Sequence, residues 1–384
     1  MAKMEYPDEH RGGARIKVML VFGTRPEAIK LAPVIKELEK QSEKFQPVVA
    51  VTAQHRHLLD QALSLFEITP DYDLNIMEPE QELSDIAAKT LKGMKPILEK
   101  EKPDILLVQG DTSTTFFAAL AAFYLKVPIG HVEAGLRTQD KYHPFPEEIN
   151  RRLTTHLADI HFAPTQTAKK NLVAEGVSPK AIHVTGNTVI DALLVTSEKD
   201  YKIDQPPLSK VDFSKKIITI TAHRRESWGA PLDSICQAIK KIVETNPDVE
   251  AVFSMHPNPK VQKAAKKILG DNRQVHLIEP LDYASFVHLL SKCYLILTDS
   301  GGIQEEAPSL GKPVLVMREV TERPEAIEAG TAKLVGRDAG RIVAETELLL
   351  KNKGEYRKMA QAKNPYGDGH AAEKIAEIIA NQLG

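Results

Sequence analysis

The sequence predicts an α/β protein made of two doubly wound domains, each a parallel sheet covered by helices. Short apolar runs of strand length alternate along the chain with longer segments of helical periodicity. The strands are apolar almost throughout, which is typical of parallel strands that are buried on both faces. At 384 residues the chain is also long enough for two domains of ordinary size.

Composition excludes several classes of function. Charged residues make up 27% of the chain, yet the net charge is only -2, so neither nucleic acid nor an anionic membrane is the expected partner. No apolar run approaches the ~20 residues that a membrane span needs. Two cysteines, Cys236 and Cys293, lie in apolar surroundings and are expected to be free thiols in the cytoplasm. Residues 1–15 are polar, resemble no secretory signal, and are predicted to form a disordered extension.

The first domain is predicted over residues 16–200. Its first strand, Ile16 to Phe22, ends at Gly23, and Thr24 and Glu27 then have the spacing of a capping box that begins a helix. Pro33 inside this helix predicts a kink or a late helix start. Further strands are expected at residues 47–53, 104–108, 128–132, 160–163 and 182–184, with helices at 58–66, before 102, at 116–124 and from 147.

The second domain is predicted over residues 201–369, after a linker at 204–216 that contains Pro206 and Pro207. Strands are expected at 217–221, 250–255, 275–278, 295–298, 314–317 and 333–335, with helices between them. A turn at 364–369 separates this domain from an amphipathic helix at 371–383.

Ser300, Gly301 and Gly302 mark the point where an apolar strand passes into a short helix. Adjacent glycines let the backbone approach a ligand closely, and the first turn of a helix offers unpaired N–H groups. This combination is typical of a phosphate site, although a tight strand-to-helix turn would look the same.

Ligands of doubly wound sheets bind at the carboxyl ends of the strands, and two such sheets are expected to share one cleft. Asp111, Glu133 and Glu147 follow successive strands of the first domain, so they are candidates for acid and base chemistry. Asp111 could instead cap the next helix, and Glu147 could simply occupy a first helical turn. His223 ends a strand of the second domain and could donate to a phosphate.

Arg25 begins a helix and could complete the anion site, and Lys30 follows on the same helix; either could also be solvated. The nucleotide-hydrolysis loop, the dinucleotide-binding glycine motif and the serine-nucleophile elbow are all absent from the sequence. Histidines and cysteines do not cluster at zinc spacing, so no metal and no redox cofactor is expected.

The motifs around these residues resemble those of the non-hydrolysing UDP-N-acetylglucosamine 2-epimerases. The similar stretches, in chain order, are Phe22 to Lys30, Thr52 to Arg56, His131 to Thr138, Pro146 to Glu148, His223 to Glu226, Thr298 to Lys312, Thr321 to Glu325 and Asn364 to Gly369. They cover the chain from about Ile16 onward without large gaps.

This resemblance implies a glycosyltransferase-B-like pair of Rossmann-like domains, with residues 370–384 crossing back onto the first domain. It implies reversible epimerisation of UDP-N-acetylglucosamine to UDP-N-acetylmannosamine at C2, through UDP elimination to a bound 2-acetamidoglucal. The family needs no cofactor, usually forms homodimers and serves cell-envelope polysaccharide synthesis. Some members require UDP-N-acetylglucosamine as an allosteric activator.

The resemblance also assigns residues to roles. Asp111, Glu133 and Glu147 become acid and base candidates, with His223 and Arg25 assisting the diphosphate. The expected substrate-binding residues are Arg25, Lys30, Phe286 at uracil, Ser300, Gly301, Gly302, Glu306 at the ribose, and Arg323 at the UDP end. The expected activator-site residues are Gln54, His55, Arg56, Arg225 and His256. Three positions depart from the family's usual residues: Gln109, Gln139 and Pro257.

Three other functions share these features. A hydrolysing epimerase would release N-acetylmannosamine and UDP, and would need a positioned water. A retaining glycosyltransferase would need an acceptor pocket. A UDP-sugar sensor would need no group of three carboxylates, which argues against it.

Overall fold

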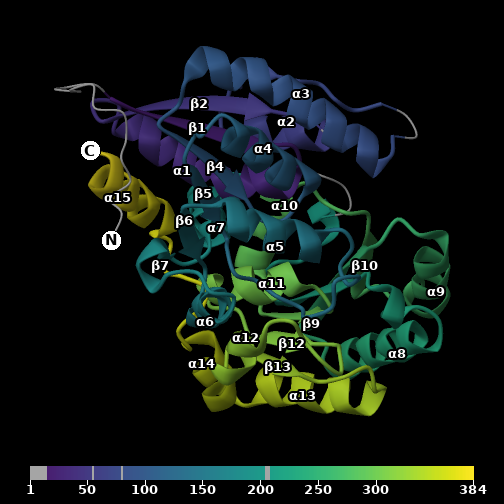
Figure 1. Ribbon diagram of the computed structural model, residues 1–384. Helices are drawn as coiled ribbons and strands as arrows, with labels where there is room; N and C mark the ends of the chain where they lie inside the picture. The colour runs from purple at the N-terminus through teal and green to yellow at the C-terminus, as the bar shows by residue number, and fades with distance from the viewer. Residues whose placement is uncertain (1–14, 54–55, 79–80, 204–207) are drawn as a thin grey trace. The chain divides into compact units, whose positions relative to one another are not determined.

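The computed structural model describes residues 15–53, 56–78, 81–203 and 208–384, and the statements that follow concern these residues (Figure 1). The chain divides into two compact units, of which unit 1 contains the residues up to Thr188 together with His370–Gly384, and unit 2 contains Val189–Gly369. Nearly all of the predicted N-terminal extension and the two prolines of the predicted linker lie outside the described residues.

Unit 1 is built on a seven-stranded sheet in the order β3-β2-β1-β4-β5-β6-β7, in which every pair of neighbours is parallel. The strands are β1 (Ile16–Phe22), β2 (Phe45–Val51), β3 (Tyr72–Asp73), β4 (Ile105–Gln109), β5 (Ile129–Val132), β6 (Ile160–Ala163) and β7 (Ile182–Val184). The predicted parallel sheet is therefore confirmed, and the short edge strand β3 is an addition that the sequence pattern did not indicate.

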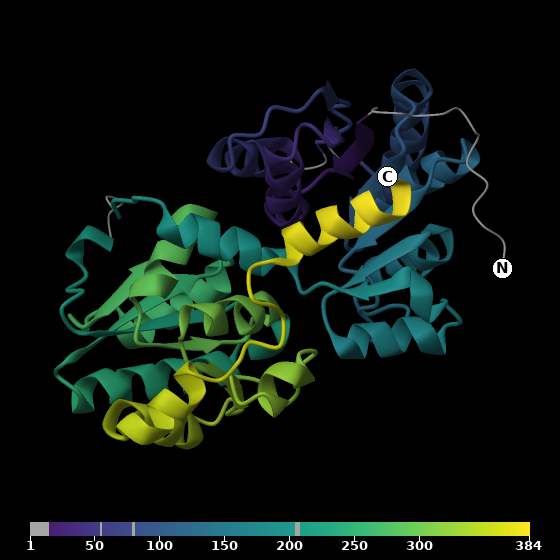
Figure 2. The same ribbon diagram turned by 90° about the vertical axis from the view of Figure 1, so that its left-hand side faces the viewer.

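The helices of unit 1 lie on both faces of this sheet. They are α1 (Arg25–Lys40), α2 (Arg56–Leu65), α3 (Leu83–Glu101), α4 (Ser113–Tyr124), α5 (Glu147–Leu157), α6 (Gln166–Ala174) and α15 (Ala371–Leu383). Helices α3, α4 and α5 pack in a row, whereas α1 packs against α2 and α15. The return of the C-terminal helix to the first domain is thus confirmed, and Figure 2 shows α15 in yellow.

The entry into α1 follows the sequence pattern in one respect and departs from it in another. The capping box of Thr24 and Glu27 is present, and the Glu27 carboxylate accepts a hydrogen bond from the Thr24 N–H at 2.8 Å. The predicted late helix start is wrong, because α1 begins at Arg25 and continues through Pro33. The capping box fixes the first turn before the proline is reached.

Unit 2 has a six-stranded parallel sheet in the order β10-β9-β8-β11-β12-β13. Its strands are β8 (Lys216–Ala222), β9 (Val249–Met255), β10 (Val275–Ile278), β11 (Leu295–Thr298), β12 (Val314–Val316) and β13 (Ala332–Leu334). Its helices are α8 (Ala230–Thr245), α9 (Pro259–Leu269), α10 (Tyr283–Lys292), α11 (Gly301–Glu306), α12 (Pro324–Glu328), α13 (Ala339–Lys351) and α14 (Lys353–Ala360). Short 3-10 turns are η1 (Pro179–Ala181), η2 (Leu208–Lys210), η3 (Arg225–Ser227) and η4 (Ala307–Leu310).

Both faces of the second sheet are buried, as the continuous apolar strands predict. In β8 the neighbouring residues Ile217 and Ile218 belong to different core clusters, because successive side chains of a strand point to opposite faces. The helix α7 (Thr188–Glu198) contributes Val189 and Ile190 to the Ile217 cluster. The division between the units therefore falls before the predicted boundary at residue 200.

No helix in the described ranges is both long enough and apolar enough to span a membrane.

Candidate functional site

Unit 1 gathers its candidate residues where three neighbouring strands end. Strands β1, β4 and β5 are adjacent in the sheet, and Gln109 at the end of β4 is in register with Val132 at the end of β5. Asp111 and Glu133 closely follow these two positions. The carboxyl ends of adjacent parallel strands meet at one edge, so the topology brings the two carboxylates onto neighbouring loops.

Glu133 is held in an unusual conformation by specific partners. Its backbone has φ of 63°, in the left-handed region that non-glycine residues rarely adopt. The side chain is 6% exposed, and its Oε2 lies 2.5 Å from Lys30 Nζ. The Gln109 side-chain amide donates a hydrogen bond to the same oxygen. Strained, buried and polar positions of this kind cluster at functional sites.

Asp111 does not cap the helix that follows it. Thr112 is the N-cap of α4, and its hydroxyl accepts a hydrogen bond from Thr115 N. The Asp111 carboxylate instead pairs with Arg151 of α5 at 2.5 Å. Burial raises the pKa of Asp111; the Arg151 charge opposes this shift, while the charges of Glu133 and Glu147 add to it. These carboxylates therefore share one electrostatic environment.

Glu147 is the first residue of α5, so its placement in a first helical turn is confirmed. That placement does not use its whole side chain, because Glu147 Oε2 is buried without a hydrogen-bond partner. A buried carboxylate oxygen without a donor is costly, and such groups often await a ligand or water.

The neighbouring residue Glu148 anchors the loop that leads into α5. Its carboxylate is fully buried and accepts hydrogen bonds from Thr138 N at 3.1 Å and from Arg152 Nε at 2.9 Å. Arg152 also donates to Gln139 Oε1, and Gln139 has φ of 67°. Glycine adopts this backbone conformation without strain, whereas the Cβ of Gln139 makes it sterically costly.

Arg25 and Lys30 lie on α1 but have different surroundings. Lys30 forms the ion pair with Glu133, so it acts on a carboxylate of the same unit. Arg25 is half-buried at the first position of the helix, and no hydrogen bond or ion pair joins its guanidinium to the residues that the structure describes. Its charge is therefore available to an anionic ligand.

In unit 2 the fully buried Asp299 organises the loop after β8. Its carboxylate accepts hydrogen bonds from His223 N, from Arg224 N at 2.9 Å and from the Ser227 hydroxyl at 3.0 Å. The His223 side chain is 36% exposed, and burial lowers the pKa of this imidazole, with the Asp299 charge opposing the shift. A neutral imidazole can donate a hydrogen bond to a phosphate at neutral pH.

Positive charge surrounds the first turn of α11. A methyl group built on Gly301 would lie 3.8 Å from the Arg323 guanidinium and 3.9 Å from that of Arg224. The preceding residue, Ser300, is the N-cap, and its N–H is bonded to the Thr298 hydroxyl at 3.0 Å. Helix N–H groups flanked by two arginines favour a phosphate at this turn.

Polar and aromatic groups follow beside this turn. A methyl group built on Gly302 would lie 3.5 Å from Glu306 Oε1, and the Tyr283 hydroxyl donates to Glu306 Oε2 at 3.4 Å. Phe286 lies one turn after Tyr283 on α10 and is partly buried against the unit 2 core. The Glu306 carboxylate thus lies next to the Gly302 turn and contacts α10, the helix that carries Phe286.

The expected activator residues are described only in part. Gln54 and His55 lie outside the described residues, and the side chains of Arg56 and Arg225 are not described. His256 is half-buried, and its Nδ1 accepts a hydrogen bond from Asn258 N at 3.1 Å. That bond gives His256 a structural task in the turn before α9.

The sequence patterns predict no site role for four side chains that contact or flank the candidate residues of units 1 and 2. They are Gln109, Arg151, Arg224 and Tyr283. Arg151 had a recognisable signal, because it lies one helical turn after Glu147 on the same helix. Arg224 stands in the His-Arg-Arg run that drew attention to His223. Gln109 stands out in the sequence only as a departure from the family's usual residue, and nothing in the sequence around Tyr283 distinguishes it from an ordinary helix residue.

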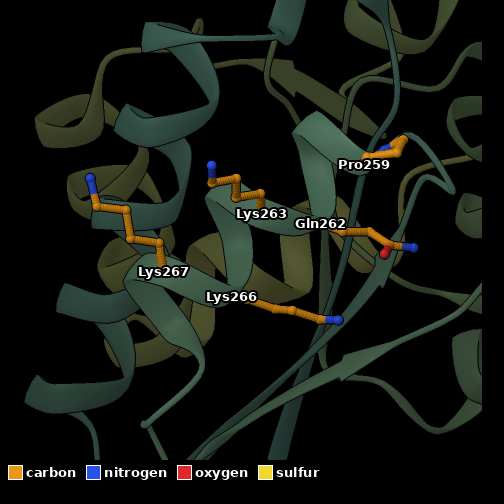
Figure 3. A pocket seen from close by; sticks show the side chains of 5 residues that line it. All are labelled: Pro259, Gln262, Lys263, Lys266 and Lys267. Atoms are coloured by element: carbon orange, nitrogen blue, oxygen red, sulfur yellow. The ribbon is translucent and has the colours of Figure 1, made fainter.

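A surface hollow of about 530 Å³ lies elsewhere, beside α9. Figure 3 shows its lining residues, which are Pro259, Gln262, Lys263, Lys266 and Lys267. None of them belongs to the groups described above. Within the described ranges, no cluster of histidine, cysteine and acidic residues has the arrangement of a metal site.

Comparison with known proteins identifies the family. A profile of the UDP-N-acetylglucosamine 2-epimerases matches residues 36–380. The UDP-N-acetylglucosamine 2-epimerase of Escherichia coli (strain K12) is 54% identical over 372 residues, 95% of this chain and 99% of that protein. The UDP-GlcNAc 2-epimerase of Neisseria meningitidis bound to UDP-GlcNAc has a TM-score of 0.83 and 50% identity, over 95% of this chain and 100% of that one. The Methanocaldococcus jannaschii enzyme in complex with UDP-GlcNAc and UDP has a TM-score of 0.75 and 37% identity, with the same coverage of both chains. The chain therefore belongs to the UDP-N-acetylglucosamine 2-epimerase family.

Proposed function

We propose that this protein is a non-hydrolysing UDP-N-acetylglucosamine 2-epimerase. It interconverts UDP-N-acetylglucosamine and UDP-N-acetylmannosamine, which supplies precursors of cell-envelope polysaccharide. The C2 proton is removed as the C1–O bond to UDP breaks, giving UDP and a bound 2-acetamidoglucal. A proton then adds to the other face of C2, and UDP adds back at C1.

The observation that carries the proposal is the set of coupled carboxylates in unit 1. The C2 proton of the sugar is a poor acid, so its removal needs a positioned base, and reprotonation needs a positioned acid. Asp111, whose pKa is raised by burial, and Glu147, with its unpartnered buried oxygen, supply such groups. Lys30 and Gln109 hold Glu133 in one orientation, as an acid or base in a transition state requires.

Unit 2 is proposed to bind the UDP part of the substrate. The N–H groups of Gly301 and Gly302 and the Arg323 guanidinium would hold the diphosphate, with His223 donating to it. Glu306 would accept hydrogen bonds from the ribose hydroxyls, and Phe286 would pack on uracil. Arg25, supplied by α1, would stabilise the negative charge that develops on the leaving UDP.

We also propose that the protein is a cytoplasmic homodimer. Free buried thiols at Cys236 and Cys293 fit a reducing compartment. Helix α4 exposes Phe123 and Tyr124 at its end, at 54% and 67%, and the neighbouring α5 exposes Leu153 at 42%. Exposed apolar side chains on adjacent helices favour association with a second copy.

The experiment that tests the function is proton NMR of UDP-N-acetylglucosamine incubated with the protein in D2O. Formation of UDP-N-acetylmannosamine, with deuterium at C2 of both epimers, is the expected result. Free N-acetylmannosamine and UDP would identify a hydrolysing enzyme instead. An unchanged sugar nucleotide that still binds would contradict the proposal and favour a transferase or a sensor.

A further inference from the structure

Glu27 accepts more hydrogen bonds than any other carboxylate in the described part of unit 1. No role in the reaction has been assigned to it. Glu27 of α1 is 1% exposed, and no lysine or arginine forms an ion pair with it in the described part of the chain. Four hydrogen bonds from backbone N–H groups and hydroxyls reach its two oxygens. A buried carboxyl group without a cation is tolerated only when such partners replace its hydration.

The two oxygens serve two different loops. Oε2 accepts from Gly23 N at 3.1 Å, and from the Thr24 N–H at 2.8 Å and hydroxyl at 2.7 Å, all at the end of β1. Oε1 accepts from the Thr112 hydroxyl at 2.7 Å, at the start of α4, and lies 3.1 Å from the Thr115 hydroxyl, which donates to Gln109 O at 2.7 Å. One rigid carboxylate therefore joins the end of β1 to the loop that follows the neighbouring strand β4.

These loops carry proposed site residues. Arg25 lies directly after Thr24, and Asp111 lies directly before Thr112. Any movement of the β1 loop against the start of α4 would change the distance between the Arg25 and Asp111 backbones. The Glu27 bridge resists that movement, since it spans the two loops with hydrogen bonds to both.

A capping box alone does not explain this arrangement. The box needs one acceptor for the Thr24 N–H, and a glutamine at the same position would serve equally well. Here Oε2 accepts from two N–H groups and a hydroxyl of the β1 loop, while Oε1 reaches the Thr112 hydroxyl of the other loop. The side chain therefore makes a second contact that a capping box does not require.

We propose that Glu27 is a positioning residue, whose carboxyl group holds the loops of Arg25 and Asp111 at the separation that the reaction requires. This proposal rests on the epimerase function proposed above. Misplacement of reacting groups by ~1 Å can cost about 100-fold in rate, so breaking the bridge should act on turnover. Binding of UDP should be unaffected, because the residues proposed to hold the bound nucleotide belong to unit 2, whereas Arg25 is proposed to act on the charge that develops as the C1–O bond breaks.

Threonine variants test the bridge with a matched control. Thr112→Val removes the hydroxyl that donates to Glu27 and also removes the N-cap acceptor of α4. Thr165→Val removes the N-cap of α6, whose hydroxyl accepts from Ala168 N at 3.1 Å, the same distance as in α4. Both variants lose a comparable cap, but only the first touches the Glu27 bridge.

The expected result is at least a tenfold lower kcat for Thr112→Val with the Kd for UDP unchanged, and a kcat within twofold of wild type for Thr165→Val. Thr112→Ser, which restores the hydroxyl, should recover the rate, and Glu27→Ala, which removes both oxygens, should lose more than Thr112→Val. If Thr112→Val matches the Thr165→Val control in kcat, the bridge is only structural and the proposal is overturned. An inactive wild-type protein in the same assay would overturn the proposed function itself, which is a distinguishable outcome.

Discussion

The ion pair between Lys30 and Glu133 is buried, so we predict that its coupling energy is larger than that of an exposed ion pair. The atoms are 2.5 Å apart, and the side chains are only 20% and 6% exposed. At an effective dielectric constant of about 20, their attraction is about 7 kcal/mol. Desolvation of both groups offsets most of this, so we expect a net coupling energy of about 1–3 kcal/mol.

The assay is a double-mutant cycle with Glu133→Gln, Lys30→Met and the double variant, measured as free energies of unfolding in urea. The control cycle uses Lys36 and Glu39, a pair on the same helix at 2.9 Å whose side chains are 41% and 45% exposed. Exposed pairs of this kind couple by about 0.3–0.5 kcal/mol. A coupling for Lys30 and Glu133 no larger than the control would refute the reasoning about burial.

The same Glu133→Gln variant tests whether Glu133 takes part in the reaction, through its effect on kcat. Loss of a positioned acid or base costs about 100-fold to 10,000-fold in rate, so kcat should fall by at least 100-fold while UDP still binds. Calorimetric titration with UDP measures the binding of UDP independently of turnover. Near-normal turnover would contradict the role assigned to Glu133.

Two further predictions concern pH and nucleotide binding. His131 is fully buried, and burial lowers its pKa to about 3, so protonation favours the unfolded chain and stability falls as pH decreases below the unfolded value of 6.5. This residue alone should cost about 2–3 kcal/mol between pH 7 and pH 4.5; His131→Gln should reduce the pH dependence of urea unfolding by that amount, and an unchanged dependence would contradict the argument. Arg323→Ala should weaken UDP binding about 10-fold to 100-fold in a calorimetric titration, because it removes a charge-assisted contact at the phosphate turn; Arg341→Ala, on α13, removes an arginine that bonds the Leu334 carbonyl and should leave binding unchanged, and equal Kd values for both variants would remove Arg323 from the site.

Much of the architecture could be predicted because apolar runs indicate where the strands lie. The residues that follow each strand are then expected in loops at the edge of the sheet. The pattern of apolar runs alone was enough to locate Asp111, Glu133 and the Ser300 turn at strand ends. It could not reveal pairings between distant residues: Thr112 donates to Glu27 across 85 positions of the chain. It also placed the boundary after α7 and not at its start, because the helix's apolar residues do not show which of the two cores they join.

The return of α15 to unit 1 has a consequence for synthesis on the ribosome. The chain leaves unit 1 after Thr188 and re-enters it at His370, so all of unit 2 is translated in between. Until then the surface of α1 that packs against α15 lacks its cover, and Ile375 and Ile379, both fully buried in the finished protein, have not been made. The domain that begins first is therefore completed after the second, and its uncovered helix must avoid aggregation while unit 2 is translated.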